Sequence, residues 1–492
     1  MVEIGSVISD DETPNFYMFR FRPEPEVTLA PGEFVCVQIA DKKHIIGRVT
    51  GSVETNPHET VDNVTARKTL KIKADYPTEG ESVIIYRVYQ VDVLEQIVEE
   101  DNEFKTIPVD TLIKSGSSVT TPSEKMIVEF LGLNANPDKG YNLGRLDIPG
   151  SKAMNLLVKR DIIQRHIFIG GTTGSGKSYA AKVLIEEIHK KHIPIIVFDT
   201  QYEFVPLTEK LHGKVLVPAQ DYTIPLHVLT LDEILNIVPI VNDTHTALLS
   251  SAILELKDDQ NLRNSFTLED LINRIETAGE EMHSSKATVP IVEGRVNFAI
   301  GHSNYIGSGY DWTNTLKKDA IIDINCRDFE RQSLQVILAA TLRELQVLRK
   351  ENKIPPFIIF IDEAHLFVPD DEQTACKQII RETVRIGRHH GICAALITQS
   401  PIDIDKKIIR QCNTRFIFAL EADQLMAIQG VKADATEEML NRLPKAQQGS
   451  CILTGTYETV KHAVPIQIRE LENTDADAGQ TPNIFSDVDQ YA

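Results

Sequence analysis

The sequence predicts an α/β protein with a mainly parallel, helix-covered sheet, a small amino-terminal β-barrel and a helical insertion. Three observations lead to this prediction. From about residue 141 onward, short β-branched apolar runs alternate with helical segments, as in parallel sheets covered on both faces. Residues 1–100 contain short strand-like runs without a helical period. Between residues 229 and 300 the strand-like runs stop and helical spacing replaces them.

Length and composition limit the class of protein. The 492 residues are enough for about two to four domains. A hydrophobic fraction of 42% and a charged fraction of 25% are ordinary for globular proteins and exclude wholesale disorder. The 51 basic and 71 acidic residues give a net charge of −20, so the chain is not a general polycation that coats nucleic acid. Any nucleic-acid contact must come from a locally basic surface.

The sequence favours a cytoplasmic protein. No apolar run reaches the roughly 18 residues that a membrane span needs. The start of the chain has neither the basic nor the apolar region of a signal peptide. The cysteines lack CxxC pairs and His-rich flanks, which favours reduced thiols, several of them in core strands, over a metal site. They are Cys36, Cys326, Cys376, Cys393, Cys412 and Cys451.

Residues 1–100 are predicted to form a small barrel for docking or assembly. Tyr17, Phe19 and Phe21 alternate and are expected to share one face of a strand. Turns are predicted at Pro31-Gly32 and at residues 77–80. Five or more short strands in such a stretch indicate a barrel. The further predicted strands are Phe34–Ile39, His44–Val49, Thr69–Ile72 and Val83–Val93.

The rest of the chain divides into a linker (101–140), an α/β core (141–228 and 301–470), the insertion (229–300) and an acidic tail (471–492). Within the insertion, Thr230 with Glu233 and Thr267 with Asp270 resemble helix capping boxes. The tail is expected to be frayed, or to anchor on a neighbouring subunit through its apolar residues. The predicted core strands are His166–Ile169, Ile193–Phe198, Ala320–Ile324, Phe357–Ile361, Ile392–Ile397 and Arg415–Ala419.

A phosphate-binding loop follows the strand His166–Ile169 and opens a helix near Tyr179. Its glycines let backbone amides surround the phosphates, and the helix start adds partial positive charge. We expect Lys177 to reach the β- and γ-phosphates of ATP and Ser178 to bind Mg²⁺. The residues expected to bind the nucleotide are Gly171, Thr172, Thr173, Gly174, Ser175, Gly176, Lys177, Ser178 and Tyr179.

Two carboxylates follow the apolar strand Phe357–Ile361. In that position Asp362 is expected to hold Mg²⁺, directly or through water, and Glu363 to orient and polarise the attacking water. Asp199, at the end of another strand, either lies near the nucleotide or forms a turn. Gln399 either senses the γ-phosphate or closes the end of its strand.

Arg381, Arg385 and Arg388 share one face of a predicted helix that ends abruptly at Gly391. Such a face is often only solvated. In ring ATPases, however, an arginine placed in this way reaches the γ-phosphate of the neighbouring subunit and stabilises the transition state. Arg388, Arg385 and Arg165, which precedes the phosphate-loop strand, are the candidates for this role.

Several motifs together resemble the HerA helicase–translocase family, within the group that includes FtsK and the conjugative coupling ATPases. The resemblance covers nearly the whole chain. It rests on the amino-terminal strands, residues 170–178, the Asp199 strand, residues 361–367, 385–391, 398–401 and 411–414.

This resemblance implies a RecA-like core and a hexameric ring ATPase that uses ATP and Mg²⁺ to move duplex DNA through its channel. It also implies a barrel that docks a partner, typically a nuclease such as NurA. Some bacterial relatives pair with sirtuin-like or nuclease effectors in antiphage defence, so DNA end processing and defence both stay open. Two segments depart from the family pattern: Gln201–Phe204 replaces a small Gly-Glu-Tyr-type turn, and the arginine segment reads RIGRHH where the family usually has REGRKY.

DNA-contacting residues are less well marked. Lys406, Lys407 and Arg410 form one basic group, and Lys210 and Lys214 flank His212 in another. Either group could follow a phosphate backbone, and either could be a solvated cluster. Two other functions stay open: an ATP-binding scaffold that licenses an effector with little unwinding, and a protein-unfolding ring. No aromatic–hydrophobic pore loop is apparent that would support the unfolding ring.

Overall fold

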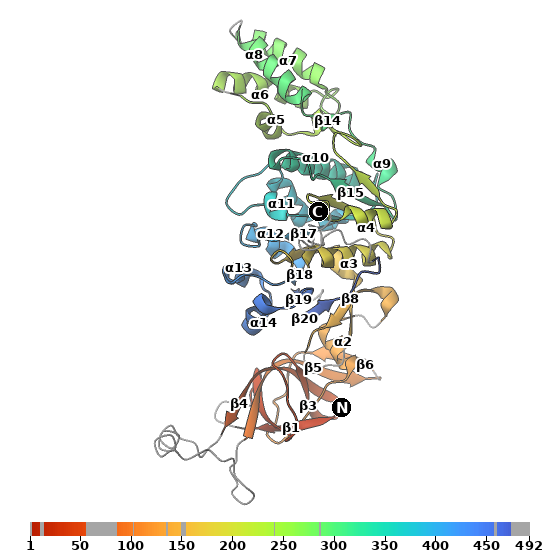
Figure 1. Ribbon diagram of the computed structural model, residues 1–492, viewed down its shortest axis with the longest axis vertical. Coiled ribbons are helices and arrows are strands. Elements are labelled where there is room, and N and C mark those ends of the chain that lie inside the picture. Colours follow the sequence, from red (N-terminus) through yellow and green to blue (C-terminus); the bar gives the residue numbers. More distant parts are fainter. Residues whose placement is uncertain are drawn as a thin grey trace, which may run out of the picture.

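The structure is a computed structural model. It describes residues 2–9, 14–55, 86–101, 103–133, 136–148, 154–240, 242–284, 287–456 and 460–473. An amino-terminal sheet, a central α/β core and a helical bundle follow one another along its long axis (Figure 1). The predicted strand Thr69–Ile72, the predicted turn at 77–80 and most of the predicted tail fall outside the described residues. Within them, no helix has the length and apolar character to cross a membrane.

The amino-terminal sheet has the strand order β2-β1-β7-β3-β4-β5-β6, and β2 also pairs with β5. The strands β6 and β7 and the helix α2 (Glu124–Leu131) come from residues 101–140, which the sequence predicted to be a linker. Part of that predicted linker therefore belongs to the amino-terminal sheet. The strands are β1 (Glu3–Ile8), β2 (Met18–Pro23), β3 (Phe34–Ala40), β4 (Lys43–Thr55), β5 (Tyr86–Glu100), β6 (Glu103–Ile107) and β7 (Ser118–Thr120).

One detail of the aromatic alternation was wrong. Phe19 and Phe21 are fully buried, and the Phe21 ring stacks on Tyr89 with centroids 5.4 Å apart. Tyr17, however, is 83% exposed. The reason is that β2 begins at Met18, so Tyr17 precedes the strand and does not follow its alternation.

The central sheet is mixed. Seven parallel strands stand in the order β12-β15-β11-β16-β17-β10-β18, and the antiparallel strands β19-β20-β8-β9 extend one side. The parallel strands are β10 (His166–Gly170), β11 (Ile195–Asp199), β12 (Lys214–Leu216), β15 (Ile321–Asn325), β16 (Phe357–Ile361), β17 (Ile392–Thr398) and β18 (Cys412–Ile417). The antiparallel strands are β8 (Gly140–Leu146), β9 (Asn155–Lys159), β19 (Ser450–Gly455) and β20 (Val464–Ile468), none of which the sequence predicted.

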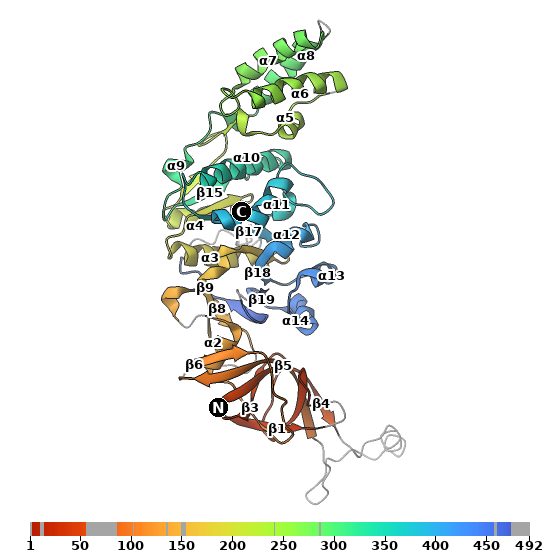
Figure 2. The same cartoon turned by 180° about the vertical axis from the view of Figure 1, so that it is seen from behind.

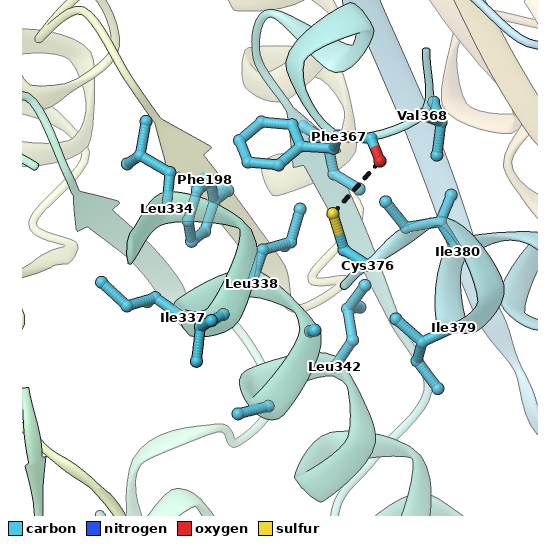
Figure 3. Packing of buried hydrophobic residues seen from close by; sticks show 14 of the residues in the cluster. Phe198, Leu334, Ile337, Leu338, Leu342, Phe367, Val368, Cys376, Ile379 and Ile380 are labelled. Atoms are coloured by element: carbon cyan, nitrogen blue, oxygen red, sulfur yellow. Dashed lines mark hydrogen bonds between the residues drawn. The ribbon is translucent and has the colours of Figure 1, made fainter. Parts of the chain in front are cut away.

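Both faces of the parallel sheet are buried, as its apolar strands indicated. Along β11, Ile195 and Val197 belong to the cluster that contains α3, while Ile196 and Phe198 belong to the cluster that contains α10 and α11. Figure 3 shows Phe198 packed beside α10, with Phe367 nearby. The core helices are α3 (Lys177–His189), α4 (Val205–Lys210), α10 (Arg331–Lys350), α11 (Lys377–His390), α12 (Lys406–Gln411), α13 (Ala422–Ile428) and α14 (Glu437–Arg442).

All six cysteines are free and buried. Cys36, Cys393, Cys412 and Cys451 lie in strands, as expected for core thiols. Cys376 precedes α11, and its thiol donates a hydrogen bond to the Phe367 carbonyl at 3.2 Å (Figure 3).

The insertion consists of four helices, and both predicted capping boxes are present at its helix starts. Its ends meet where β13 (Ile224–Pro225) pairs in parallel with β14 (Ile306–Gly307). The bundle lies at the end of the molecule opposite the amino-terminal sheet (Figure 2). Its helices are α5 (Leu231–Ile237), α6 (Asp243–Asp258), α7 (Leu268–Glu281) and α8 (Thr288–Gly301).

The junction between insertion and core contains a partly buried acid, Glu344. The indole of Trp312, on the short helix α9 (Trp312–Thr315), donates to Glu344 on α10 at 3.1 Å. Burial raises the pKa of Glu344 to about 7, and the hydrogen bond from Trp312 opposes that shift. Since the folded protein holds this proton more tightly than the unfolded chain does, the resulting stability is present below pH 4.5 and is lost as the pH rises through 7.

We therefore predict that Glu344→Gln makes stability less dependent on pH. In wild type, Glu344 must lose its proton at a partly buried position as the pH rises, whereas glutamine stays neutral. The free energy of unfolding of the variant is therefore expected to rise by about 2–3 kcal/mol relative to that of wild type between pH 5 and pH 8. Thermal melting of both proteins across this range measures the difference. Parallel melting-temperature profiles would contradict the prediction.

Candidate nucleotide-binding and catalytic site

The predicted site residues converge because four parallel strands end at the same edge of the sheet. The phosphate loop follows β10, Asp199 ends β11, Asp362 follows β16 and Gln399 follows β17. The order β11-β16-β17-β10 makes these strands neighbours. In open α/β sheets, ligands bind outside these carboxyl ends.

The phosphate loop has the backbone that its glycines allow. Gly174 and Gly176 adopt positive φ values of 76° and 108°. A Cβ at Gly171 would lie 2.5 Å from the Cβ of Phe418, so a larger residue does not fit there. The Lys177 ammonium donates to the Thr172 carbonyl at 2.8 Å, which places it within the curve of the loop. Burial lowers the pKa of Lys177, while the nearby charge of Glu363 acts in the opposite direction.

Asp362 is buried, and its carboxylate accepts a hydrogen bond from the Thr200 hydroxyl at 3.0 Å. Burial, reinforced by the charges of Glu363 and Asp199, raises the pKa of Asp362 well above its usual range. A cation beside Asp362 would relieve this repulsion. Ser178, which is half-buried, is the second residue of the helix α3 that follows the phosphate loop. Among the described residues no set of three His, Cys, Asp or Glu side chains could hold a metal by itself. This donor set suits Mg²⁺, which keeps water and phosphate ligands.

Glu363 is held in an unusual conformation. Its backbone is left-handed, with φ 48° and ψ 48°. One carboxylate oxygen, Oε1, accepts from the Gln201 amide at 2.6 Å. The other, Oε2, is buried without a hydrogen-bond partner, although His365 Nδ1 lies 3.3 Å away. Burial raises the pKa of Glu363, and Lys177 counteracts this effect.

Asp199 shapes a turn. It is fully buried, and its two oxygens accept backbone N–H groups of Gln201, Glu203 and Phe204 at 3.0, 3.2 and 2.8 Å. Burial raises its pKa, and these hydrogen bonds lower it. Of the two interpretations that the sequence left open, the turn-forming one matches this geometry.

Gln399 contacts the phosphate loop directly. Its side-chain oxygen accepts from the Thr173 hydroxyl at 2.7 Å, so the loop and the end of β17 are linked. Beside it, the Thr398 hydroxyl lies 3.2 Å from His365 Nδ1. Burial lowers the pKa of His365, which favours a neutral ring between Thr398 and Glu363.

The Tyr179 side chain is engaged away from the loop, because its hydroxyl accepts from the backbone N–H of Leu471 at 2.8 Å. A second contact was missed by sequence reasoning: the N–H of Gly449 donates to the Ser175 carbonyl at 3.0 Å. Gly449 has a φ of 81°, and no local motif announces its position beside the loop.

The candidate arginines lie at the opposite edge of the sheet. Arg165 precedes β10 and Arg388 lies in the last turn of α11, just before β17 begins. Arg165, His389 and Lys318 line a cavity of about 950 Å³ at this edge. Arg385 is exposed, whereas Arg381 pairs with the buried Asp405 of its own chain.

The two basic groups differ. The Lys214 ammonium donates to the Tyr310 hydroxyl at 2.8 Å and also lies over that ring. Lys407 and Arg410, on the short helix α12, are exposed.

Comparison with known proteins fits this geometry. Residues 141–345 match the family described as Helicase HerA, central domain, and residues 332–449 match Helicase HerA-like C-terminal. The chain belongs to the HerA family. It is accordingly a P-loop ATPase of the helicase class.

Similar proteins include "Probable helicase MJ1565" of Methanocaldococcus jannaschii, 23% identical over 70% of this chain and 69% of that protein. "DNA double-strand break repair helicase HerA" of Sulfurisphaera tokodaii is 20% identical over 90% of this HerA-family chain and 96% of its own length. The solved structure of VirB4 of Thermoanaerobacter pseudethanolicus matches with a TM-score of 0.55 and 18% identity, covering 70% of this chain and all of that solved chain. That likeness supports the P-loop ATPase fold with its mixed sheet.

We predict that Asp199→Asn slows ATP hydrolysis by roughly tenfold or more, because an amide cannot accept all three turn N–H groups and the residues after it lose their positions. Steady-state ATPase measurements at saturating ATP test this. Asp221→Asn, which alters an exposed turn where the carboxylate accepts from Val217, is the matched control. Equal rates for the two variants would contradict the prediction.

Proposed function

We propose that this HerA-family chain is a ring-shaped, ATP-driven DNA translocase or helicase that hydrolyses ATP at interfaces between subunits. The observation that carries the proposal is that the nucleotide-binding residues and the candidate arginines lie at opposite edges of the same sheet. The phosphate loop and Asp362–Glu363 stand at the carboxyl edge of the sheet, while Arg165 and Arg388 stand at the amino edge. A five-residue strand spans roughly 16 Å, so a neighbouring copy is the natural recipient of those arginines.

Within one site, each residue has a proposed task. Lys177 and the amino terminus of α3 bind the phosphates, and the amides of residues 171–176 surround them. Ser178 and Asp362 would hold Mg²⁺, which would supply positive charge beside the phosphates. Glu363 accepts the proton of the attacking water. Gln399 accepts a hydrogen bond from Thr173 of the phosphate loop. Through this contact it is proposed to sense the γ-phosphate at the end of β17.

The ring is proposed to be a homo-oligomer, and the resemblance to the family implies a hexamer. An arginine from the adjacent subunit, Arg388 in the first place and otherwise Arg385 or Arg165, stabilises the charge that develops on the γ-phosphate. Arg385 is exposed and Arg165 lines a cavity. Both positions support the proposal that an arginine at this edge reaches the nucleotide site of an adjacent subunit.

Duplex DNA is the proposed track. The relatives named as DNA double-strand break repair helicases support this choice. The chain carries a net charge of −20, so contact must be local, and the exposed Lys407 and Arg410 are better placed for it than Lys214, which is held by Tyr310. Phosphate contacts of this kind do not depend on base sequence.

A partner is proposed to dock on the amino-terminal domain, taken as a barrel because β2 pairs with both β1 and β5. The partner classes are a NurA-like nuclease or a sirtuin-like or nuclease effector, in DNA end processing or antiphage defence. The proposed domains are this barrel, predicted as 1–100 and extended by β6 and β7 to Thr120, the ATPase core (141–228 and 301–470) and the insertion (229–300). The strands β13 and β14 join the ends of the insertion.

The first test is Glu363→Gln. This change removes the proton acceptor but leaves the phosphate loop intact, so we expect ATP affinity within a few-fold of wild type and turnover reduced by about 100-fold or more. Binding of a fluorescent ATP analogue and ATPase assays measure the two effects. Normal hydrolysis by this variant would refute the assigned base. Wild-type turnover that ignores duplex DNA would instead favour the scaffold function.

The second test mixes two inactive variants. Lys177→Ala subunits keep their arginines, and Arg388→Ala subunits keep their phosphate loop. Mixed rings contain interfaces that combine an intact loop with an intact arginine, so we expect ATPase activity to return. Parallel mixtures with Arg385→Ala and Arg165→Ala identify which arginine crosses the interface. Failure of every mixture, with each variant inactive alone, would contradict action in trans.

A further inference from the structure

Two consecutive residues after β11 contact the two consecutive carboxylates after β16. The Thr200 hydroxyl donates to Asp362 Oδ2 at 3.0 Å, and the Gln201 amide donates to Glu363 Oε1 at 2.6 Å. The strands β11 and β16 are parallel neighbours, with Phe198 opposite Ile361. The two contacts are offset from this register by one residue, because the chain turns around the Asp199 carboxylate directly after β11. In the sequence, Gln201 is marked only as a departure from the family turn.

The turn that carries Gln201 is rigidly defined. Asp199 accepts three backbone N–H groups within it, and Tyr202 adopts a left-handed φ of 65°. This conformation favours glycine, so the surrounding hydrogen bonds must hold the backbone of Tyr202 in it. The Tyr202 ring lies 5.9 Å from the Arg327 guanidinium, directed to a group outside the site. Gln201 is therefore held at a fixed place beside Glu363.

The two oxygens of Glu363 are not equivalent. Oε1 is occupied by Gln201, whereas Oε2 is buried and makes no hydrogen bond. A general base needs one oxygen free to accept a proton and a fixed orientation toward the water. The hydrogen bond at Oε1 fixes the carboxylate, and Oε2, which is buried 3.3 Å from His365 Nδ1, makes no hydrogen bond to a described side chain.

We propose that Gln201 is a positioning residue that anchors Glu363 through Oε1 and leaves Oε2 as the atom that takes the proton from the attacking water. This inference rests on the proposed role of Glu363. In the step itself, a water oxygen bonds to the γ-phosphorus, the bond to the β–γ bridging oxygen breaks, and the water proton passes to Oε2. Gln201 acts only through Glu363, and its amide group stays neutral and unchanged throughout.

The principal experiment compares Gln201→Ala and Gln201→Glu with wild type. Gln201 is exposed, so neither change leaves a cavity in the core. We expect kcat at saturating ATP to fall roughly 10- to 100-fold in both variants, because Ala removes the donor and Glu replaces it with a like charge. KM, the affinity for a fluorescent ATP analogue and the melting temperature are expected to stay close to wild type.

Tyr202→Gly is the matched control on the same turn. Glycine suits the left-handed backbone, and the lost ring contacts Arg327 outside the site. This variant is expected to hydrolyse ATP at nearly the wild-type rate. Equal losses in Tyr202→Gly and Gln201→Ala would mean that turn shape, and not the amide donor, matters, and would overturn the proposal.

The remaining outcomes separate this inference from the proposed function. Wild-type kcat in Gln201→Ala, with Glu363→Gln inactive, would overturn the role of Gln201 and leave Glu363 as the base. Activity in Glu363→Gln would overturn both. A Gln201→Glu variant as active as wild type would overturn the requirement for a donor.

Discussion

The site depends on the parallel alignment of β11 and β16. Because Phe198 stands opposite Ile361, the residues that follow the two strands leave the sheet together. Asp199 then turns one chain so that Thr200 and Gln201 reach Asp362 and Glu363. A shift of register by one residue would send each side chain to the other face of the sheet and separate these pairs.

Charge is the second determinant. Asp199, Asp323, Asp362 and Glu363 are all buried at this end of the sheet, and the buried Lys177 is the cation that acts on Glu363. Asp323 shows the consequence most clearly, since burial and the charge of Asp199 raise its pKa well above the usual range. Buried carboxylates cost free energy unless compensated. A cation bound beside these carboxylates would offset part of that cost.

Local patterns predicted the elements that carry the chemistry. Apolar runs ending in polar residues located β10, β11, β16 and β17 to within two residues, and side-chain spacing located both capping boxes. The pairs β8–β9 and β19–β20 were missed by the sequence prediction. The pairing of β20 with β8, which joins them to one sheet, was not predictable, because pairing between strands some 300 residues apart leaves no local signal. The same applies to Gly449 beside Ser175, and to β6 and β7, which lie in a stretch that reads as a connector.

The short ladder between β13 and β14 has a consequence for how such chains diversify. The chain leaves the core through β13 and returns through β14, and these two strands pair with each other. The distance between the exit and return points is therefore fixed by this pairing and does not depend on the segment between them. Loop-closure entropy grows slowly with length, and here the ladder already fixes the ends. The distal bundle can consequently lengthen, shorten or be exchanged for another module while the ATP-binding edge keeps its geometry.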